Sequence, residues 1–535
     1  RAQLPRRGAA GVAAMLTIIL PALLGGCAPD VGVSAGSPEP LPVATTAGAD
    51  DPGTPVTTTV GTGTDSQGVA AYDPGPVDWR ELDDDLDEAY VTVPVDYADP
   101  TGPTIDLYVV RHRALDPDRR IGPLLVNPGG PGAPGSDLAL FAPFQFARPL
   151  LEHFDIIGWD PRGTGASTPA IECISDADYD RMFAEIDSTP DAPGEHELLV
   201  ELAEEFAAGC AIGSAGILEH VGTNNSARDM DAIRRALGED TISYFGFSYG
   251  SELGATWVTL FPDTVRAAVL DGASDPEAEA LDSSLQQLRG FEESVVRFLE
   301  ECGRRDCAFA PDGDPDAAYF DLMESLDADP VPSVPGRPDV NRDVAISAVI
   351  QAMYSDSYWR ALEHSLAAAQ KGDGSGLLEL HDAYYRRNPD GTYGNMFEAF
   401  QAISCADTPE RPTVAEVDAE ADLYEQAAPH LVPEGSAGGY FCTFFPPARD
   451  PRTTITGAGA GPIVVIGTTG DPATPFESTV AMAEALEDGR LIEVEANQHL
   501  GYGVNRCVVD AVNDYLIDLV VPPERLECGD GGFFG

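Results

Sequence analysis

The chain has 535 residues, of which 43% are hydrophobic, so it can bury a sizeable core in one large domain or in several ordinary ones. Its formal net charge of −58 at pH 7 would repel nucleic acid, and we therefore expect no nucleic-acid partner. Lys371 is the only lysine, and we interpret the acidic bias as a property of the genome or an adaptation to salt rather than as a functional patch.

The first 27 residues have the pattern of a secretory signal. Arg1, Arg6 and Arg7 precede an apolar stretch at 11–24, which is too short and too rich in Gly and Ala for a membrane helix. The following Leu-Gly-Gly-Cys resembles a bacterial lipobox and predicts lipidation at Cys27. An ordinary signal peptide is the alternative. We expect an exported protein that is held on the cell membrane by its lipid anchor alone, facing outside, or is secreted.

A linker and then an α/β fold are expected along the rest of the chain. Residues 28–75 are rich in Gly, Pro and Thr without any period, which predicts a disordered linker. Strands that alternate with helices predict an α/β fold with a mostly parallel sheet and helices on both faces. We expect 76–275 to form the N-terminal part of the core, 276–440 to form a helical cap, and 441–535 to complete the core.

The expected elements follow apolar runs and turn signals. A cap inserted before the last two strands would lie over the carboxyl edge of the sheet, where such folds bind ligands. One helix is expected over 226–237, with Asn225 as its N-cap. The expected strands are 90–95, 105–110, 123–127, 154–159, 241–245, 265–271, 462–467 and 491–494.

The cysteines predict disulfides. Nine are present, and eight remain when Cys27 is set aside, an even number in a chain that we expect to be exported. The sequence does not choose among the possible pairings. No C-x-x-C or H-E-x-x-H motif occurs, so we expect neither a metal nor a cofactor. We guess at sequential pairing: Cys173–Cys210, Cys302–Cys307, Cys405–Cys442 and Cys507–Cys528.

The segment 246–250 (G-F-S-Y-G) has the pattern of a nucleophile elbow. An apolar strand at 241–245 precedes it and a helical segment follows it, which is the context that such a turn requires. The glycines permit a tight turn that would expose the hydroxyl of Ser248. The helix N-terminus behind it would favour a negatively charged oxygen.

A serine hydroxyl needs a base, and the base needs an orienting acid. Of the eight histidines, only His499 follows the last expected strand. Asp471 follows the strand before that one, in a loop rich in Gly and Pro. The order Ser248, Asp471, His499 is the one that a parallel α/β sheet with an elbow uses. We predict these residues as nucleophile, acid and base.

Two backbone N–H groups should stabilise the oxyanion that this chemistry forms. The N–H of Tyr249, directly after the nucleophile, is one candidate. The other should come from a loop after an early strand, and the turn at 127–132 (N-P-G-G-P-G) is in that place. Pro131 has no N–H, so we predict Gly129 or Gly130 as the second donor.

Four motifs occur along the chain in this order: 127–132 (N-P-G-G-P-G), 158–165 (G-W-D-P-R-G-T-G), 246–250 (G-F-S-Y-G) and 470–475 (G-D-P-A-T-P). Together they resemble the secreted, actinobacterial tripeptidyl-aminopeptidase-like branch of the α/β hydrolases, which is related to the proline iminopeptidases. The resemblance covers about residues 79–528. It implies a serine exopeptidase that releases short peptides, with tripeptides expected, from free N-termini.

Two questions stay open at this point. An aminopeptidase needs a carboxylate for the substrate ammonium, and Asp407 or Glu252 is a candidate. A carboxylesterase or lipase that acts on cell-envelope esters would use the same three residues. A non-catalytic surface binding protein on the same scaffold is a further alternative. The sequence does not indicate an oligomeric state.

Overall fold

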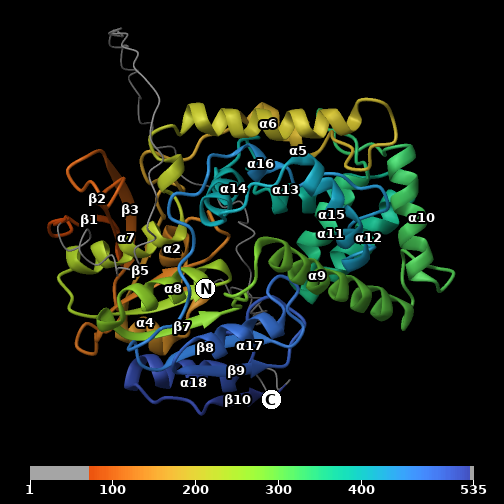
Figure 1. The fold of residues 1–535 in the computed structure, drawn as a ribbon. Coiled ribbons are helices and arrows are strands. Elements are labelled where there is room, and N and C mark those ends of the chain that lie inside the picture. The colour runs from red at the N-terminus through yellow and green to blue at the C-terminus, as the bar shows by residue number, and fades with distance from the viewer. Residues whose placement is uncertain (1–71, 530–535) are drawn as a thin grey trace, which may run out of the picture.

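The computed structural model describes residues 72–529, so Cys27, the expected signal and nearly all of the expected linker lie outside the described residues. A ten-stranded sheet crosses the core in the order β1-β2-β3-β5-β4-β6-β7-β8-β9-β10 (Figure 1). The pairs β1–β2, β2–β3 and β3–β5 are antiparallel. All pairs from β5–β4 to β9–β10 are parallel. The strands are β1 (Arg80–Asp83), β2 (Leu86–Pro94), β3 (Thr104–His112), β4 (Gly122–Asn127), β5 (Phe154–Trp159), β6 (Ile242–Phe247), β7 (Val265–Asp271), β8 (Ile463–Thr468), β9 (Gly489–Val494) and β10 (Arg525–Cys528).

Helices cover both faces of this sheet, as the sequence predicts for an α/β fold. Every residue of β4, β5, β6 and β8 is buried, because a parallel strand between two helical layers meets apolar side chains on both sides. One face packs on α7 (Thr223–Ala236), α8 (Tyr249–Leu260) and α17 (Phe476–Ala485). The other packs on α4 (Arg148–His153) and α18 (Arg506–Asp518).

The two strands that the sequence did not predict lie at the edges of the sheet. All four residues of β1 are exposed, and β10 buries only Cys528. Edge strands this short and polar lack the apolar run by which central strands are recognised.

Between β7 and β8 the described chain is helical and has a core of its own, made mainly of α9 to α13. This group lies beside the sheet in Figure 1. We call the helices between β7 and β8 the cap. They are α9 (Ala280–Gly303), α10 (Pro315–Ala328), α11 (Arg342–Met353), α12 (Trp359–Ala369), α13 (Ser375–Tyr384), α14 (Met396–Asp407), α15 (Val414–Ala427) and α16 (Phe441–Phe444).

A second helical segment joins the cap from between β5 and β6. Helices α5 (Asp176–Phe183) and α6 (Glu195–Gly213) lie with the cap helices, and α6 packs along α16 (Figure 1). Phe206 of α6 contacts Phe397 and Phe441 of the cap. The helical layer therefore extends beyond the stretch 276–440 expected from sequence, because periodicity shows that a segment is helical but not where it packs.

Four disulfides fix the ends of these elements. They join Cys173 to Cys210, Cys302 to Cys307, Cys405 to Cys442 and Cys507 to Cys528, which are the pairs that sequential pairing gives. Cys405–Cys442 connects α14 with α16, and Cys507–Cys528 connects α18 with β10. No helix within residues 72–529 is long and apolar enough to cross a membrane.

The motif at 158–165 is buried framework. The Arg162 guanidinium is fully buried and donates to both carboxylate oxygens of Asp229 on α7, at 2.8 and 2.6 Å. It also donates to the Val95 carbonyl, and the Tyr97 hydroxyl donates to Asp229. A paired and hydrogen-bonded buried charge of this kind fixes how β2, β5 and α7 meet.

Candidate active site

Ser248 lies at the sharp turn between β6 and α8, near the middle of the sheet. Its backbone has φ 55° and ψ −128°, a conformation that non-glycine residues rarely adopt. Its N–H donates to the Asp271 carbonyl at the end of β7, at 2.8 Å. The side chain is half-buried. This is the strained, outward-facing geometry of a nucleophile elbow.

The two flanking glycines are required by close backbone approach. A Cβ on Gly246 would lie 2.1 Å from the Gly250 carbonyl oxygen. A Cβ on Gly250 would lie 2.7 Å from the Asn127 carbonyl oxygen. The G-x-S-x-G pattern therefore reflects the packing of the elbow against itself and against the end of β4.

His499 and Asp471 lie on neighbouring loops and contact each other. His499 Nδ1 is 2.8 Å from Asp471 Oδ1 and 2.9 Å from Oδ2, so Nδ1 carries the proton that the carboxylate accepts. His499 Nε2 is buried and has no hydrogen-bond partner among the described residues. The carboxylate also accepts from the backbone N–H of Ala473 and Thr474, which fixes its orientation. The Thr474 hydroxyl is 3.3 Å from His499 Nδ1.

Asp271 connects the elbow with the histidine loop, and the sequence analysis placed it only at the end of a strand. Its carbonyl accepts from Ser248, while its two carboxylate oxygens accept from Gly501 and Tyr502, each at 2.8 Å. Burial raises its pKa to about 7, although the two N–H donors and the nearby His499 oppose the rise. The sequence signal that could have indicated this role is an aspartate at the end of the strand next to the elbow strand.

The loop with the expected glycine donors lies against the elbow, but within the described residues only one of the two glycines has a free N–H. A Cβ on Gly129 would lie 2.9 Å from Tyr249 N, so the glycine-rich loop lies directly against the elbow. The Gly129 N–H, however, donates to the Asn127 side chain at 2.9 Å. Within residues 72–529 no acceptor is recorded for the N–H of Gly130 or of Tyr249. Of the two glycines, Gly130 therefore remains as the free donor.

The cap holds the acid loop directly. On α9, Arg297 Nη2 donates to the Gly470 carbonyl at 3.1 Å, and Gln287 Nε2 donates to the Ala473 carbonyl at 3.0 Å. Gly290, between them, allows the helix to approach the Pro472 carbonyl, from which a Cβ would be only 2.6 Å away. The position of Asp471 thus depends on α9.

The cap also contacts the other two loops. The His499 N–H donates to the Tyr354 carbonyl at 2.9 Å, and Ser355 forms a bridge with Gln498. In the glycine-rich loop, a Cβ on Gly132 would lie 2.5 Å from the Met396 carbonyl of α14. The acid loop, the histidine loop and the glycine-rich loop therefore each rest on a different segment of the cap.

Asp407 and Glu252 lie in one network beside the elbow. Both carboxylate oxygens of Asp407 accept from Thr223, one from its N–H at 2.7 Å and one from its hydroxyl, which also contacts the Tyr249 hydroxyl. Glu252 pairs with Arg452 at 3.0 Å. Burial and the charge of the neighbouring Glu252 together raise the pKa of Asp407 to about 7, although hydrogen bonds from Thr223 oppose the rise.

This network corrects the expected start of one helix. Helix α7 begins at Thr223 with Gly222 as its N-cap, three residues before the predicted start, and Asn225 lies inside it. The acceptor for the first turn is Asp407, which is 184 residues away in the sequence. A cap supplied from so far away leaves no local signal.

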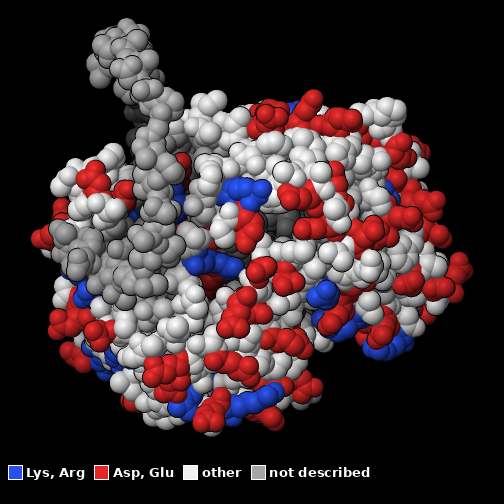
Figure 2. All heavy atoms as spheres, in the orientation of Figure 1, with Lys and Arg blue, Asp and Glu red and all other residues white. Residues whose placement is uncertain are grey.

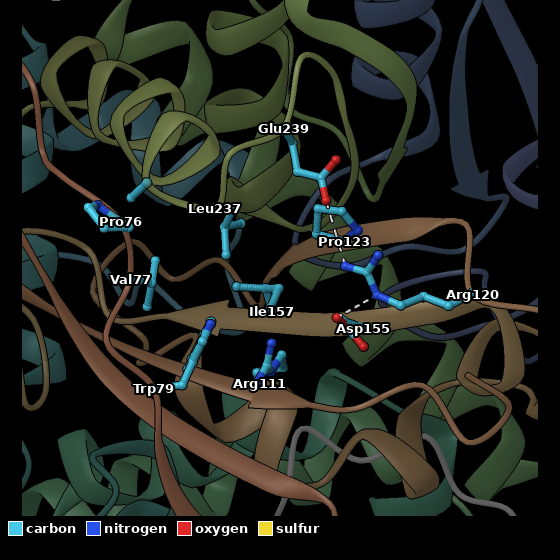
Figure 3. Close-up of a pocket in the computed structure, with 11 residues that line it drawn as sticks. Pro76, Val77, Trp79, Arg111, Arg120, Pro123, Asp155, Ile157, Leu237 and Glu239 are labelled. Carbon is cyan, nitrogen blue, oxygen red and sulfur yellow. Dashed lines mark hydrogen bonds and ion pairs between the residues drawn. The ribbon is translucent and has the colours of Figure 1, made fainter. Parts of the chain in front are cut away.

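A cavity of about 200 Å³ lies elsewhere, at the opposite edge of the sheet. Figure 3 shows it between the starts of β4 and β5 and the end of α7, with Trp79 and Arg111 on one side and Arg120 on the other. Arg111 stacks on Trp79, and Arg120 pairs with Asp155. Its arginines are thus already partnered, and it is separate from the catalytic loops, which follow the carboxyl ends of the strands.

Comparisons with known proteins agree with this geometry. A family model described as alpha/beta hydrolase fold matches residues 122–505. The serine protease Hip1 of Mycobacterium tuberculosis is 35% identical over 465 residues, covering 82% of this chain and 86% of that protein. Carboxylesterase B of the same species is 37% identical over 454 residues, covering 82% and 86%. The tripeptidyl aminopeptidase of Streptomyces coelicolor is 31% identical over 464 residues, covering 82% and 84%.

These matches span most of the chain and of each relative, and the matched family model includes the elbow, the acid loop and the histidine loop. A serine, a histidine and an aspartate held in this way on a parallel sheet are the parts of a serine hydrolase. The chain is such an enzyme, and it belongs to the α/β hydrolase family, in the tripeptidyl-aminopeptidase-like group.

Proposed function

We propose that this serine hydrolase is an exopeptidase that releases short peptides, tripeptides above all, from free N-termini through an acyl-enzyme on Ser248. The observation that carries the proposal is the hydrogen-bonded pair of Asp471 and His499, whose Nε2 is left without a partner among the described residues. Asp271 connects the histidine loop with the strained elbow that carries Ser248. Relatives named as a serine protease and a tripeptidyl aminopeptidase support peptides as the substrate class.

In the first half of the reaction Ser248 Oγ attacks the carbonyl carbon of the scissile amide. Its proton passes to His499 Nε2, and Asp471 stabilises the imidazolium through Nδ1. The negative charge on the carbonyl oxygen accepts hydrogen bonds from the N–H of Tyr249 and Gly130. The C–N bond then breaks, and Nε2 gives its proton to the departing amine.

In the second half a water molecule replaces the amine. Nε2 takes one proton from the water as its oxygen attacks the ester carbon of the acyl-enzyme. The bond between that carbon and Ser248 Oγ breaks, and Oγ recovers the proton from Nε2. The peptide acid leaves, and the enzyme returns to its initial protonation state.

A free N-terminus requires negative charge at a fixed distance from the serine. We assign this role to the network of Asp407 and Glu252, because two carboxylates share one cation, Arg452, next to Tyr249. One oxygen of Glu252 accepts only from the Ser274 hydroxyl, at 3.3 Å, and so keeps capacity for an ammonium. We expect Glu252→Gln to raise KM for tripeptide arylamides with a free N-terminus and to leave KM for short-chain esters unchanged.

The test is hydrolysis of a panel of mono-, di- and tripeptide arylamides, each with a free and a blocked N-terminus, beside short-chain esters. The proposal expects tripeptide cleavage that requires the free amine. A serine-reactive probe should label the wild type and the control Ser284→Ala, an exposed residue of α9, but not Ser248→Ala. Labelling of Ser248→Ala, or the absence of amide cleavage by the wild type, would contradict the proposal.

A second candidate is a carboxylesterase that acts on cell-envelope esters with the same triad. The relative named carboxylesterase B supports it. Ester turnover without any amide turnover in the same panel would select it.

We also propose that the protein is exported and anchored by a lipid on Cys27. The four disulfides within residues 72–529 support an oxidising compartment. Mass spectrometry of the protein from its native cell envelope would detect the lipid. A mature chain that retains residues before Cys27, or begins after it, would contradict the anchor.

A further inference from the structure

Three cap side chains offer hydrogen-bond donors that no described residue uses. They are Tyr354, directly after α11, Tyr384, at the end of α13, and Arg386, and we call them the donor cluster. All three residues are half-buried. No hydrogen bond or ion pair within residues 72–529 involves the two hydroxyls or this guanidinium.

The donor cluster lies next to the catalytic machinery. The Tyr354 ring is 5.7 Å from the His499 imidazole, centroid to centroid, and the two residues are joined by the backbone hydrogen bond described above. Tyr354 is close enough to Asp471, Tyr384 and Arg386 for their charges to act on it. A ligand held by these donors would therefore lie beside the reacting bond.

Arg386 has an unusual backbone for an arginine. Its φ is 54°, in the left-handed region, at the turn that ends α13. Glycine is the usual residue at this position, and a side chain there costs about 1–2 kcal/mol. Such strain persists where the side chain is needed in that place.

A core residue faces this arginine without bonding to it. Asp137 lies on α2 (Ser136–Leu140), just after the glycine-rich loop. Burial raises its pKa and Arg386 lowers it, while burial lowers the pKa of Arg386 and Asp137 raises it. Their charged atoms do not come within ion-pair distance. The guanidinium thus keeps its five N–H donors uncommitted although a carboxylate is near enough to act on its charge.

We propose that the donor cluster binds a carboxylate of the substrate beside the scissile bond. The inference rests on the peptidase function proposed above. A guanidinium and two phenol groups present only donors to an anion, and a charge-assisted pair in a half-buried site is stronger than one in water. The negative charge of Asp137 opposes the binding of an anion at Arg386. The carboxylate belongs either to an acidic side chain or to the C-terminus of a short peptide.

Two matched pairs of substrates separate these sources. The first pair is tripeptide arylamides that carry Glu or Gln next to the arylamide. The second pair is tetrapeptides with a free or an amidated C-terminus. We expect kcat/KM to favour the carboxylate member of one pair by about tenfold, the effect of one hydrogen bond to a charged group.

The variants test which residue causes the preference. Arg386→Gln should abolish it, and Tyr354→Phe should reduce it. The control Arg360→Gln, an exposed residue of α12, should leave it unchanged. Asp137→Asn should increase it, because repulsion of the anion is removed. The inference would be overturned if the ratio of kcat/KM for the carboxylate substrate to kcat/KM for the neutral one were the same in Arg386→Gln as in the wild type. If Arg386→Gln does not fold, an unchanged ratio in both Tyr354→Phe and Tyr384→Phe would overturn it.

Failure of the peptidase proposal is distinguishable from failure of this inference. If the wild type cleaves esters but no peptide, the same variants are compared on the aryl monoester of adipic acid and on its terminal amide. An acid preference that depends on Arg386 would keep the subsite on an esterase, and a ratio that does not change with Arg386 would reject it.

Discussion

The hydroxyl of Thr474 shares the proton side of His499 with Asp471. It lies 3.3 Å from Nδ1, while the Thr474 N–H fixes Asp471 Oδ1. Thr474→Val keeps the shape and the N–H but removes the hydroxyl. We expect kcat/KM to fall by about tenfold, the effect of one hydrogen bond to a group that becomes charged in the transition state.

Thr474→Ser is the matched variant, since it restores the hydroxyl without the methyl group. Steady-state kinetics on one arylamide measures both. A serine variant as slow as the valine variant would show that packing, and not the hydroxyl, is what matters at this position.

The raised pKa of Asp271 predicts how the free energy of unfolding changes with pH. Its pKa is raised from 3.8 to about 7 in the folded state, so the native protein holds the proton more tightly than the unfolded chain. Its contribution to stability is present at low pH and is lost as pH rises from about 4 to 7. Asp271→Asn removes this term, and the free energy of unfolding should then decrease less over that range than it does in the wild type.

Urea unfolding at pH 4.5, 5.5 and 7 measures this dependence. Asp263→Asn, at an exposed position before β7, is the control and should keep the wild-type slope. A slope in Asp271→Asn equal to that of the control would contradict the assignment.

At the scale of elements, α9 links the cap with the acid loop. Arg297 donates to the Gly470 carbonyl, next to Asp471, from a helix that belongs to the cap core. Arg297→Gln shortens this side chain, so we expect kcat to fall by about three- to tenfold with a smaller change in KM, because the acid is displaced while the substrate site remains.

Arg304→Gln, directly after the last residue of the same helix, is the matched control, because Arg304 pairs with Glu300 at the surface. It should change neither kinetic parameter, since exposed ion pairs contribute little. Equal effects of the two variants would mean that α9 acts through general stability and not through the acid loop.

At the scale of the whole molecule, the net charge is strongly negative. On the face shown in Figure 2, acidic side chains are widespread and basic ones form only small groups. A net charge of −58 repels itself in the compact state. Salt screens this repulsion, so the melting temperature should rise by several degrees between about 0.02 and 0.3 M NaCl. A melting temperature that falls with salt would show that attractive ion pairs dominate. An equal rise in sucrose of matched osmolality would point to solvent exclusion instead.

The sequence by itself determined the fold class and the three candidate catalytic residues. Buried parallel strands require continuous apolar runs, and the turns that follow them require glycine, so β6 with its elbow was readable locally. The chain order of Ser248, Asp471 and His499 then followed from the order of the strands. Cysteines close in sequence also pair most simply with their neighbours, as the four disulfides do.

Only the tertiary structure decided how the loops are supported. The start of α7 depends on Asp407, and the position of the acid loop depends on α9. Which glycine N–H is free for the oxyanion depends on the Asn127 side chain, because that side chain accepts from Gly129. The donor cluster likewise comes together from the ends of α11 and α13. Most of these contacts join residues that are far apart in the sequence. In one case an N–H expected to bind the oxyanion, that of Gly129, instead donates to a neighbouring side chain. Local propensity carries no record of such partners, because they are chosen by packing between core and cap.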